Sequence, residues 1–552
     1  MTETLSGLLT IGVLVMLLAA AYVPLGDYMA RTYSCTSHTR FEKFVYRLMG
    51  VNPDSEQSPK AYAMSIVSLS AVGVLVLMTL LMTQSWLPMD RDMADMGLAM
   101  AFNTAVSFVA NTNWQSYGGE STLGFTAQMA GLAVQNFVSA AVGMAVAIAF
   151  IRGFVRVNST SLGNLWVDLV RGTIRILLPI AFIGALVLIA NGVIQNFADT
   201  TINSVTGAKQ VLPGGPVASQ EAIKLLGTNG GGFFNANSAH PFENPNGLTN
   251  LLQVFLILLI PVALTRTLGT MLGSHRQGLA VLAAMATLWA GVLAIVTTAE
   301  VRHMSAAAQA AGGALEGKET RIGAWGSALF ATATTGTSTG AINAAHDSMT
   351  PLGGGAVLAN MMLGEVAPGG VGSGLYGILV MAILTVFIAG LMVGRTPEFL
   401  GKKISSRQMT YVALYTLTVP VLVLLGTGIA MSLPSTQDAM ANPGGHGFTE
   451  VLYAYTSGAN NNGSAFGGLT VTSTFFQVSI ALAMLFGRLV PIVLVLMLAG
   501  SLAEQGKVPV TAGTLPTHTP LFVGLLIGII VLITGLTFFP ALALGPIAEA
   551  LA

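Results

Sequence analysis

Charged residues are scarce in this sequence: Asp, Glu, Lys and Arg together make up 8% of its 552 residues. Soluble globular domains carry roughly 25% charged residues, so this chain cannot cover a water-facing surface of its size. Basic and acidic residues number 23 each, which leaves no basic surface for nucleic acid. The single cysteine, Cys35, excludes intrachain disulfides, cysteine-cluster metal sites and iron–sulfur ligation. A cytosolic enzyme, a secreted disulfide scaffold and a disordered protein are therefore excluded.

Long apolar segments are abundant instead. A helix needs about 20 apolar residues to cross the hydrocarbon core of a bilayer. Ten segments are long enough, at about 5–27, 62–87, 125–151, 170–192, 249–273, 278–300, 375–394, 411–433, 474–500 and 519–541. The sequence therefore predicts an all-α polytopic membrane protein with ten transmembrane helices.

Lys and Arg are distributed unevenly between the connecting loops. One set of loops holds 16 of them, the opposite set holds 6, and Arg488 lies inside a predicted span. Cytoplasmic loops carry the excess of Lys and Arg in membrane proteins. Both termini are therefore predicted outside, together with the four long loops at 88–124, 193–248, 301–374 and 434–473.

These four outer loops share one pattern. Each contains an apolar stretch too short to span, then a polar cluster, then a full span; the stretches are about 97–110, 217–227, 323–335 and 447–457. The clusters end at residues 113, 230, 340 and 463, so their spacings are 117, 110 and 123 residues. This regularity indicates internal duplication. We expect an extra helix and cytoplasmic loop at 1–61, repeats at 62–160, 161–274, 275–405 and 406–505, and an extra helix at 506–552.

The repeated unit favours an ion filter. Irregular backbone at membrane depth must be buried in protein or line a wet cavity. Four re-entrant loops that meet on one axis would form a ring of carbonyl oxygens able to replace the water shell of K⁺. Gly permits the unusual dihedrals of such a loop, and Asn113 tolerates them as well. Ordinary extracellular turns are the alternative interpretation of each cluster.

Several longer motifs carry a family resemblance. The stretch Gly227–Pro245 reads GTNGGGFFNANSAHPFENP and is highly distinctive. It resembles the potassium-binding A subunit of the Kdp potassium-transporting ATPases. Three further segments fit the same family, namely Asn111–Tyr117, Ala459–Phe466 and Gly394–Pro397, as does His346-Asp347-Ser348. The resemblance covers essentially the whole chain.

This resemblance implies a function and partners. The family belongs to the superfamily of potassium transporters and is similar to Trk, Ktr and HKT proteins. Its members capture extracellular K⁺ in a filter and pass it through an intramembrane tunnel to a P-type ATPase catalytic subunit (KdpB-like). A single-span C subunit (KdpC-like) and a small F peptide (KdpF-like) complete the bacterial inner-membrane complex. K⁺ and membrane lipid are thus the other expected partners.

The resemblance also implies a set of site residues. Gln115 sits where the family has a filter-supporting glutamine, and Gly231 and Gly232 follow the second filter cluster. The filter residues carried over by motif are Asn111, Thr112 and Asn113; Thr228, Asn229 and Gly230; Ser338, Thr339 and Gly340; and Asn461, Asn462 and Gly463.

The third repeat is longer than the others. Its surplus includes Ala367–Gly374, a stretch with one Pro and several Gly that will not hold a helix. It separates an apolar piece at about 352–366 from the next span. We interpret this as a broken helix whose loop, including Gly369 and Gly370, lies beneath the filter and diverts the ion sideways. A surface linker between helices is the alternative.

Charged residues within the predicted membrane region are candidate pathway groups, because such charges usually face an interior or an aqueous path. Glu365 could attract K⁺ at a tunnel mouth, and Arg488 could discourage cation passage or anchor the loop. Arg395 could act in gating or as a positive-inside anchor. We expect Lys224 and Glu221, one turn apart, to form a local ion pair.

Nucleotide-binding motifs are missing from the chain. It has no Gly-x-x-x-x-Gly-Lys-Ser/Thr phosphate loop and no Asp-Lys-Thr-Gly-Thr phosphorylation motif. We therefore expect no nucleotide binding and no ATP hydrolysis by this chain alone. A Trk/Ktr-like channel-transporter working without ATP is the main alternative. A haem subunit would need paired histidines inside spans, but all seven histidines lie in loops or at span edges. A secondary carrier would usually show inverted repeats, whereas the repeats here are parallel.

Overall fold

The computed structural model describes residues 3–302, 308, 310, 313–392, 394, 396–509 and 514–551. Within these residues ten helical segments are long and apolar enough to cross a membrane, which confirms the predicted number. They are α1 (Glu3–Ser34), α3 (Pro59–Met82), a π-helical stretch with α6 (Val134–Val155), α7 (Leu165–Arg171) continuing into α8 (Leu178–Ala190), α10 (Gly247–Leu272), α11 (His275–Arg302), α15 (Ser373–Met392), α16 (Ser406–Met431), α19 (Thr474–Ala503), and α20 (Pro520–Leu542) continuing into α21 (Ala548–Leu551).

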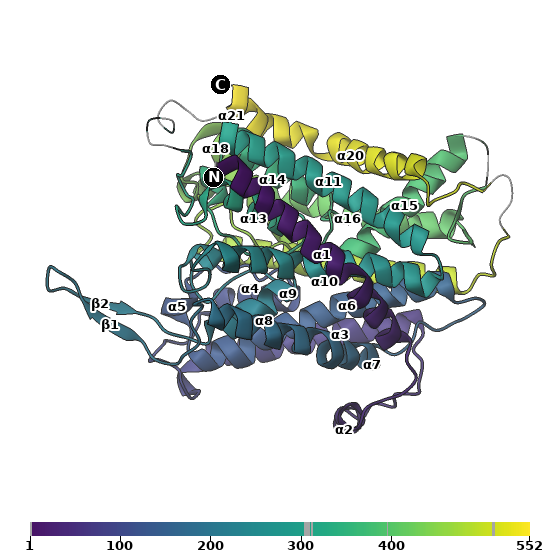
Figure 1. The fold of residues 1–552 in the computed structure, drawn as a ribbon, viewed down its shortest axis with the longest axis horizontal. Helices are drawn as coiled ribbons and strands as arrows, with labels where there is room; N and C mark the ends of the chain where they lie inside the picture. Colours follow the sequence, from purple (N-terminus) through teal and green to yellow (C-terminus); the bar gives the residue numbers. More distant parts are fainter. Residues whose placement is uncertain are drawn as a thin grey trace.

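Four shorter helices lie between the spans at the predicted places. They are α4 (Leu98–Val109), α9 (Val217–Leu226), α13 (Gly323–Thr335) and α18 (Gly444–Asn460). All four lie in the half of the bundle that carries both chain termini, as Figure 1 shows. The order of span, short helix, loop and span therefore recurs four times along the chain.

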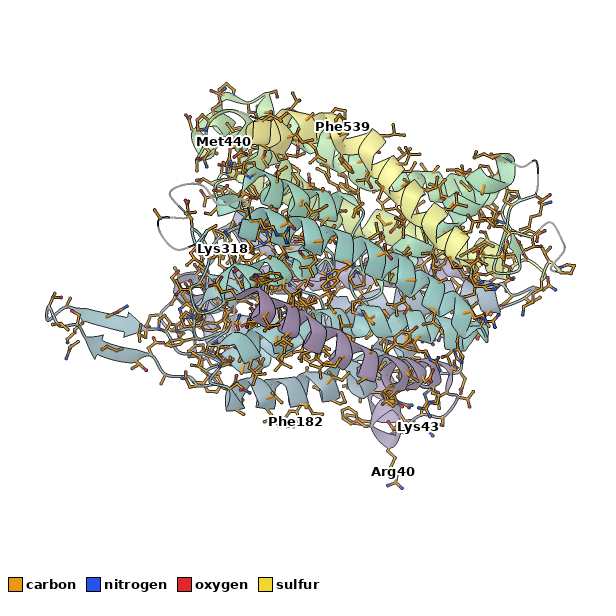
Figure 2. The ribbon with its side chains drawn as sticks, turned by 45° about the horizontal axis from the view of Figure 1, so that its top comes forward. Arg40, Lys43, Phe182, Lys318, Met440 and Phe539 are labelled. Atoms are coloured by element: carbon orange, nitrogen blue, oxygen red, sulfur yellow. The ribbon has the colours of Figure 1, made fainter. Side chains whose placement is uncertain are left out.

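The second span of each recurring unit forms the interior of the bundle. The apolar windows of the spans containing α6, α10, α15 and α19 are 83%, 67%, 67% and 56% buried, whereas every other span is at most 39% buried. The outer spans instead expose apolar side chains, such as Phe182 and Phe539 on the flanks of the molecule in Figure 2. This arrangement fits a bundle whose outer helices face lipid.

Local sequence signals explain where the spans begin and end. The side chain of Ser58 accepts a hydrogen bond from the Ala61 N–H at the start of α3, and Pro59 occupies the first helical position. Asn246 caps α10 in the same way. That helix ends at Gly273, which adopts a left-handed conformation with φ of 69°.

The remaining elements are short. The strands β1 (Thr200–Asn203) and β2 (Lys209–Leu212) form an antiparallel hairpin that projects from the end carrying the termini (Figure 1). A second pair, β3 (Glu398–Phe399) and β4 (Lys402–Lys403), follows α15. The helix α2 (Arg40–Leu48) projects beyond the far end of α1, with Arg40 and Lys43 on its surface (Figure 2). The other short helices are α5 (Gly119–Thr122), α14 (Pro351–Met362) and α17 (Pro434–Ala439).

Candidate ion filter and the cavity beneath it

The four predicted filter clusters each follow the C-terminal end of a short helix. Helices α4, α9, α13 and α18 end at Val109, Leu226, Thr335 and Asn460, and a cluster begins one to three residues after each end. The C-terminal end of a helix carries a partial negative charge from its unpaired carbonyl groups. Four such ends therefore contribute a potential that favours a cation at the clusters.

The structure brings the four clusters together. A Cβ atom at Gly230 would lie 2.8 Å from the carbonyl oxygens of both Thr112 and Thr339, so three loops meet there. A Cβ atom at Gly340 would overlap the Asn462 carbonyl oxygen, and one at Gly463 would overlap the Thr112 carbonyl oxygen. Backbone carbonyl groups from different loops thus face one another across a very small space.

Asparagine side chains cross-link neighbouring loops. The Asn111 amide donates to the Thr228 carbonyl oxygen at 2.8 Å, and the Asn229 amide donates to Asn111 and Asn113 at 2.9 and 3.0 Å. The Asn461 amide donates to the Thr112 hydroxyl at 2.9 Å. These amides hold one loop against the next, because each bond joins segments more than 100 residues apart.

Left-handed backbone conformations shape the loops at two positions each. The first residue of every cluster has a positive φ, with values of 65°, 46°, 46° and 61° at Asn111, Thr228, Ser338 and Asn461. The second left-handed residue is the last of the cluster in three loops. In the second loop it is instead Gly231, with φ of 70°. The expectation that Gly230 supplies unusual dihedrals is therefore wrong, and the close approach of other loops is what requires glycine there.

Gln115, predicted to support the filter, contacts the second candidate loop. Its side-chain oxygen accepts a hydrogen bond from the Gly232 N–H at 2.9 Å. A Cβ atom at Gly231 would lie 2.8 Å from that same oxygen and 2.8 Å from the Asn113 carbonyl oxygen. The first and second loops are thus packed in direct contact at this level.

The segment between α14 and α15 lies directly against the filter loops. Its Gly369 N–H donates to the Gly336 carbonyl oxygen at 2.7 Å, and its Val371 N–H donates to the Thr228 hydroxyl at 2.9 Å. A Cβ atom at Gly370 would lie 3.0 Å from the Ser338 side chain. All residues from 365 to 372 are buried, so the surface-linker interpretation is wrong.

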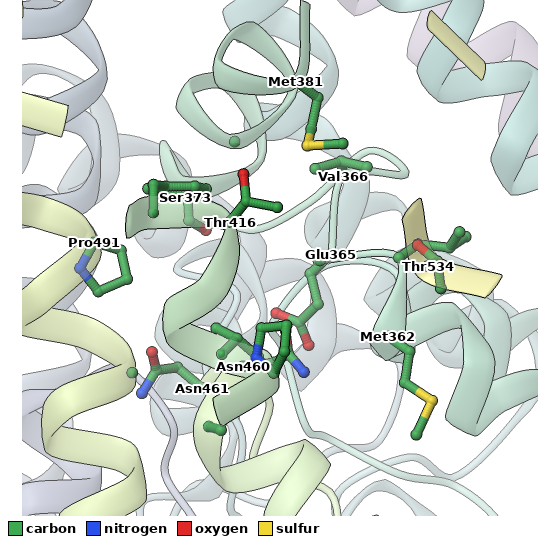
Figure 3. Close-up of a pocket in the computed structure, with 18 of the residues that line it drawn as sticks. Met362, Glu365, Val366, Ser373, Met381, Thr416, Asn460, Asn461, Pro491 and Thr534 are labelled. Atoms are coloured by element: carbon green, nitrogen blue, oxygen red, sulfur yellow. The ribbon is translucent and has the colours of Figure 1, made fainter. Parts of the chain in front are cut away.

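Glu365 and Arg488 line one cavity of about 110 Å³ beside these loops. Glu365 accepts hydrogen bonds from Asn462 at 2.8 Å and from the Ser338 hydroxyl, so it joins the third and fourth loops. Figure 3 shows Glu365 among the residues that line the cavity. The Arg488 guanidinium donates to the Ser139 carbonyl oxygen at 3.4 Å. Arg395 lies outside the described residues.

Four membrane-spanning helices contribute to the walls of this cavity, together with the ends of α14 and α18. Tyr376 belongs to α15, Thr416 to α16, Pro491 to α19 and Thr534 to α20. Helices α16 and α20 are peripheral spans with only 17% and 22% of their apolar windows buried. The cavity therefore extends from the filter loops toward the outer surface of the bundle.

A buried charge cluster stands behind the second filter loop. Lys224 pairs with Glu221 at 2.5 Å, which confirms the predicted local ion pair. Glu243 also lies 3.4 Å from the Lys224 ammonium, a contact that the sequence analysis missed. The signal was present, since Glu243 lies inside the distinctive Gly227–Pro245 motif.

His446 joins the third and fourth units at the outer end of α18. Its two ring nitrogens contact the carboxylates of Asp347 at 3.0 Å and Glu549 at 2.8 Å. Asp347, His446 and Glu450 could together hold a metal ion, because their ligand atoms lie within 4.8 Å of one another. The Glu450 carboxylate already accepts hydrogen bonds from the backbone of Ala441 and Asn442. The group is therefore satisfied within the chain as it stands.

The pairing of His446 predicts a pH-dependent stability. Hydrogen bonding to Asp347 and Glu549 raises the pKa of His446 from 6.5 to about 9, against the lowering effect of burial. The stabilisation is complete below the unfolded value and is lost as the pH rises through about 9. Wild-type protein should therefore melt above His446→Gln at about pH 6, and this difference should shrink by about pH 9.5. Thermal melting across that range measures the effect.

A second substitution provides the control for this prediction. In an Asp347→Asn background the imidazolium loses the carboxylate that contributes most to its raised pKa, so the pH dependence of the His446→Gln difference should be smaller. A difference in melting temperature that stays constant over the whole range would contradict the assignment.

Comparisons with known proteins agree with this architecture. The sequence model of the family described as potassium-transporting ATPase A subunit matches residues 12–551. A potassium-transporting ATPase potassium-binding subunit from Kineococcus radiotolerans is 57% identical over 547 residues, covering 99% of this chain and 98% of the relative. The corresponding subunit from Nocardia farcinica is 60% identical over 560 residues and is covered fully, as is this chain.

A solved structure shows the same fold at much lower sequence identity. The potassium transporter TrkH from Vibrio parahaemolyticus is similar with a TM-score of 0.54 and 12% identity. The match covers 89% of this chain and 97% of the TrkH chain. At that identity the likeness extends to the fold alone. The nearly full-length family match and the relatives at 57–60% identity show that this chain belongs to the potassium-transporting ATPase A subunit family.

Proposed function

We propose that this chain binds K⁺ from the extracytoplasmic side in the four-loop filter and delivers it sideways to a P-type ATPase partner. The observation that carries the proposal is the close packing of four uncharged loops. A Cβ atom at Gly230 would lie 2.8 Å from the Thr112 and Thr339 carbonyl oxygens, and one at Gly463 in the fourth loop would overlap the Thr112 carbonyl oxygen. Rings of backbone carbonyl oxygens replace the hydration shell of K⁺ in selective pores. The names of the curated relatives support K⁺ as the ion.

The filter binds a cation through dipoles and not through formal charge. Its proposed residues are Asn, Thr, Ser and Gly, and the four helix C-terminal ends add a favourable potential. A site without carboxylates binds a monovalent ion without holding it too tightly for release. Gln115 supports the second loop and does not bind the ion itself, because its side-chain oxygen accepts a hydrogen bond from the Gly232 N–H.

The path beyond the filter turns toward the side of the bundle. The Gly369–Gly372 segment closes the direct route, and the cavity lined by Glu365 and Arg488 offers the lateral one. Glu365 attracts the cation as it leaves the third and fourth loops. Arg488 opposes its movement onward to the cytoplasm, since like charges repel strongly where water is scarce.

The energy for K⁺ transport comes from ATP hydrolysis by another subunit of the complex. This chain is non-hydrolytic, and a KdpB-like P-type ATPase subunit receives the ion from the lateral cavity. A single-span KdpC-like subunit and a small KdpF-like peptide complete the assembly in the bacterial inner membrane. Both termini and the filter loops face the extracytoplasmic side, because the opposite loops carry the excess of Lys and Arg.

The test is the K⁺-stimulated ATPase activity of the complex purified gently with this chain. In a Gly230→Asp variant the new side chain would enter the space between Thr112 and Thr339. The K⁺ concentration for half-maximal stimulation should then rise by about tenfold or more. Helix α16 offers a matched control, Gly428→Ala, since a Cβ atom at Gly428 would meet nothing within 4 Å. A stable lone chain with no associated ATPase would refute the proposal and favour a channel-like transporter.

A further inference from the structure

Three ionisable side chains form a fully buried cluster beside the second filter loop. Glu221 and Lys224 lie on α9 and Glu243 lies beyond the loop, and each side chain is 0% exposed. The Lys224 ammonium is 2.5 Å from Glu221 and 3.4 Å from Glu243. Burying charges costs several kcal/mol per ion unless they are well paired. Apolar side chains would fill this space without that cost, so the charged groups themselves point to a role in the neighbouring loop.

The cluster is linked to both ends of the second loop. The Lys224 ammonium donates to the Asn237 side-chain oxygen at 3.1 Å, and the Asn237 amide donates to the Gly231 carbonyl oxygen. Glu243 accepts a hydrogen bond from the Phe234 N–H at 2.7 Å. The chain between Gly231 and Phe234 is therefore fixed at both ends by this one group of side chains.

The second loop has a particular need for such support. Gly230, Gly231 and Gly232 follow one another, so this part of the loop has no side chains with which to hold its own shape. Glycine also has the largest conformational freedom of any residue. In the other three loops the two residues that follow the cluster carry side chains; they are Trp114 and Gln115, Ala341 and Ile342, and Ser464 and Ala465.

We propose that Lys224 and Glu243, with Asn237 as the bridge, are positioning residues that set the place of the Gly230 and Gly231 carbonyl groups in the filter and so determine its discrimination between K⁺ and smaller cations. The inference rests on the proposed function of the filter. A site discriminates by geometry only when its ligands are held by a rigid supporting layer. Without this support the glycine carbonyl oxygens can move inward and coordinate a smaller cation as well as K⁺.

The experiment compares two lysines in the intact complex. Lys224→Met removes the ammonium that holds Asn237 and Glu243. Lys318→Met breaks another fully buried pair, Lys318 with Glu300 at 2.8 Å, whose residues are not part of the proposed filter. Lys224→Met should raise the ratio of Na⁺-stimulated to K⁺-stimulated ATPase activity by about tenfold. Lys318→Met should lower the melting temperature and leave that ratio unchanged.

A third variant keeps the test decisive if Lys224→Met fails to assemble. Asn237→Ala removes the contact with Gly231 and leaves the charges paired with each other, so it should also raise the Na⁺ to K⁺ ratio. The inference is overturned if the assembled Lys224→Met or Asn237→Ala complex keeps the wild-type ratio while Gly230→Asp changes its K⁺ dependence. If Gly230→Asp also leaves the K⁺ dependence unchanged, the filter itself is wrong and the inference falls with it.

Discussion

A chain lacking residues 368–372 is expected to leak K⁺ without ATP hydrolysis. In the intact chain this segment contacts the second loop through Val371 and Thr228 at 2.9 Å, and the third through Gly369 and Gly336 at 2.7 Å. If this segment closes the direct route beneath the filter, as proposed, its removal opens that route. The K⁺ flux into vesicles without ATP should exceed the wild-type flux by about tenfold or more, because an open filter conducts as a channel. Flux of a K⁺ tracer into vesicles containing the complex measures it.

A milder substitution separates the gate from a general loss of structure. A Cβ atom at Gly372 would overlap the Gly143 carbonyl oxygen, and Gly372 has a φ of 89° that disfavours other residues. Gly372→Ala should therefore displace the segment without shortening it and should produce a smaller leak. Gly524→Ala is the control, because a Cβ atom at Gly524 in α20 would meet nothing within 4 Å. If the 368–372 deletion and Gly372→Ala both assemble and neither increases the K⁺ flux without ATP, the segment does not close the direct route beneath the filter.

Gly463→Ala should nearly abolish high-affinity K⁺ stimulation of the complex. Gly463 has a φ of 100°, which is costly for any residue with a side chain. A Cβ atom there would also overlap the carbonyl oxygen of Thr112, so the first and fourth loops must move apart. We expect the K⁺ concentration for half-maximal ATPase activity to rise roughly hundredfold, since backbone strain and loss of ligand geometry add together.

The experiment on Gly463→Ala must distinguish a damaged filter from an unfolded subunit. Gly428→Ala in α16 is the matched control with open space around its Cβ position, and it should behave as wild type. The amount of complex recovered and its melting temperature show whether Gly463→Ala assembles. If the assembled Gly463→Ala complex keeps the wild-type K⁺ dependence, Gly463 is not a filter residue.

Much of the fold could be predicted because its signals are local. Ten apolar runs long enough to span a bilayer correspond to ten helices, since hydrocarbon requires both apolar side chains and complete backbone hydrogen bonding. The short helices were predicted from apolar stretches of insufficient length, and α4 and α13 span Leu98–Val109 and Gly323–Thr335 against predicted 97–110 and 323–335. The break before α15 followed from Pro368 and its neighbouring glycines.

The candidate site could be predicted only in part. The cluster residues were identifiable because the pattern recurs and because the motif around Gly227–Pro245 is distinctive. The position of the left-handed residue in the second loop, Gly231, was not identifiable, because Gly230 and Gly232 are identical neighbours in the sequence. Only the packing of Thr112 and Thr339 around Gly230 shows that this glycine is required by close approach.

The sequence by itself determined the membrane class, the spans, the four recurring units and the family, because composition, segment length and long motifs depend on neighbouring residues. The tertiary structure decided which spans form the interior, which side chains cross-link the loops and where the cavity opens. It also placed Glu243 beside Lys224 and Glu365 beside Ser338 and Asn462. These contacts join residues from different elements, so their existence depends on how the helices pack and not on any local pattern.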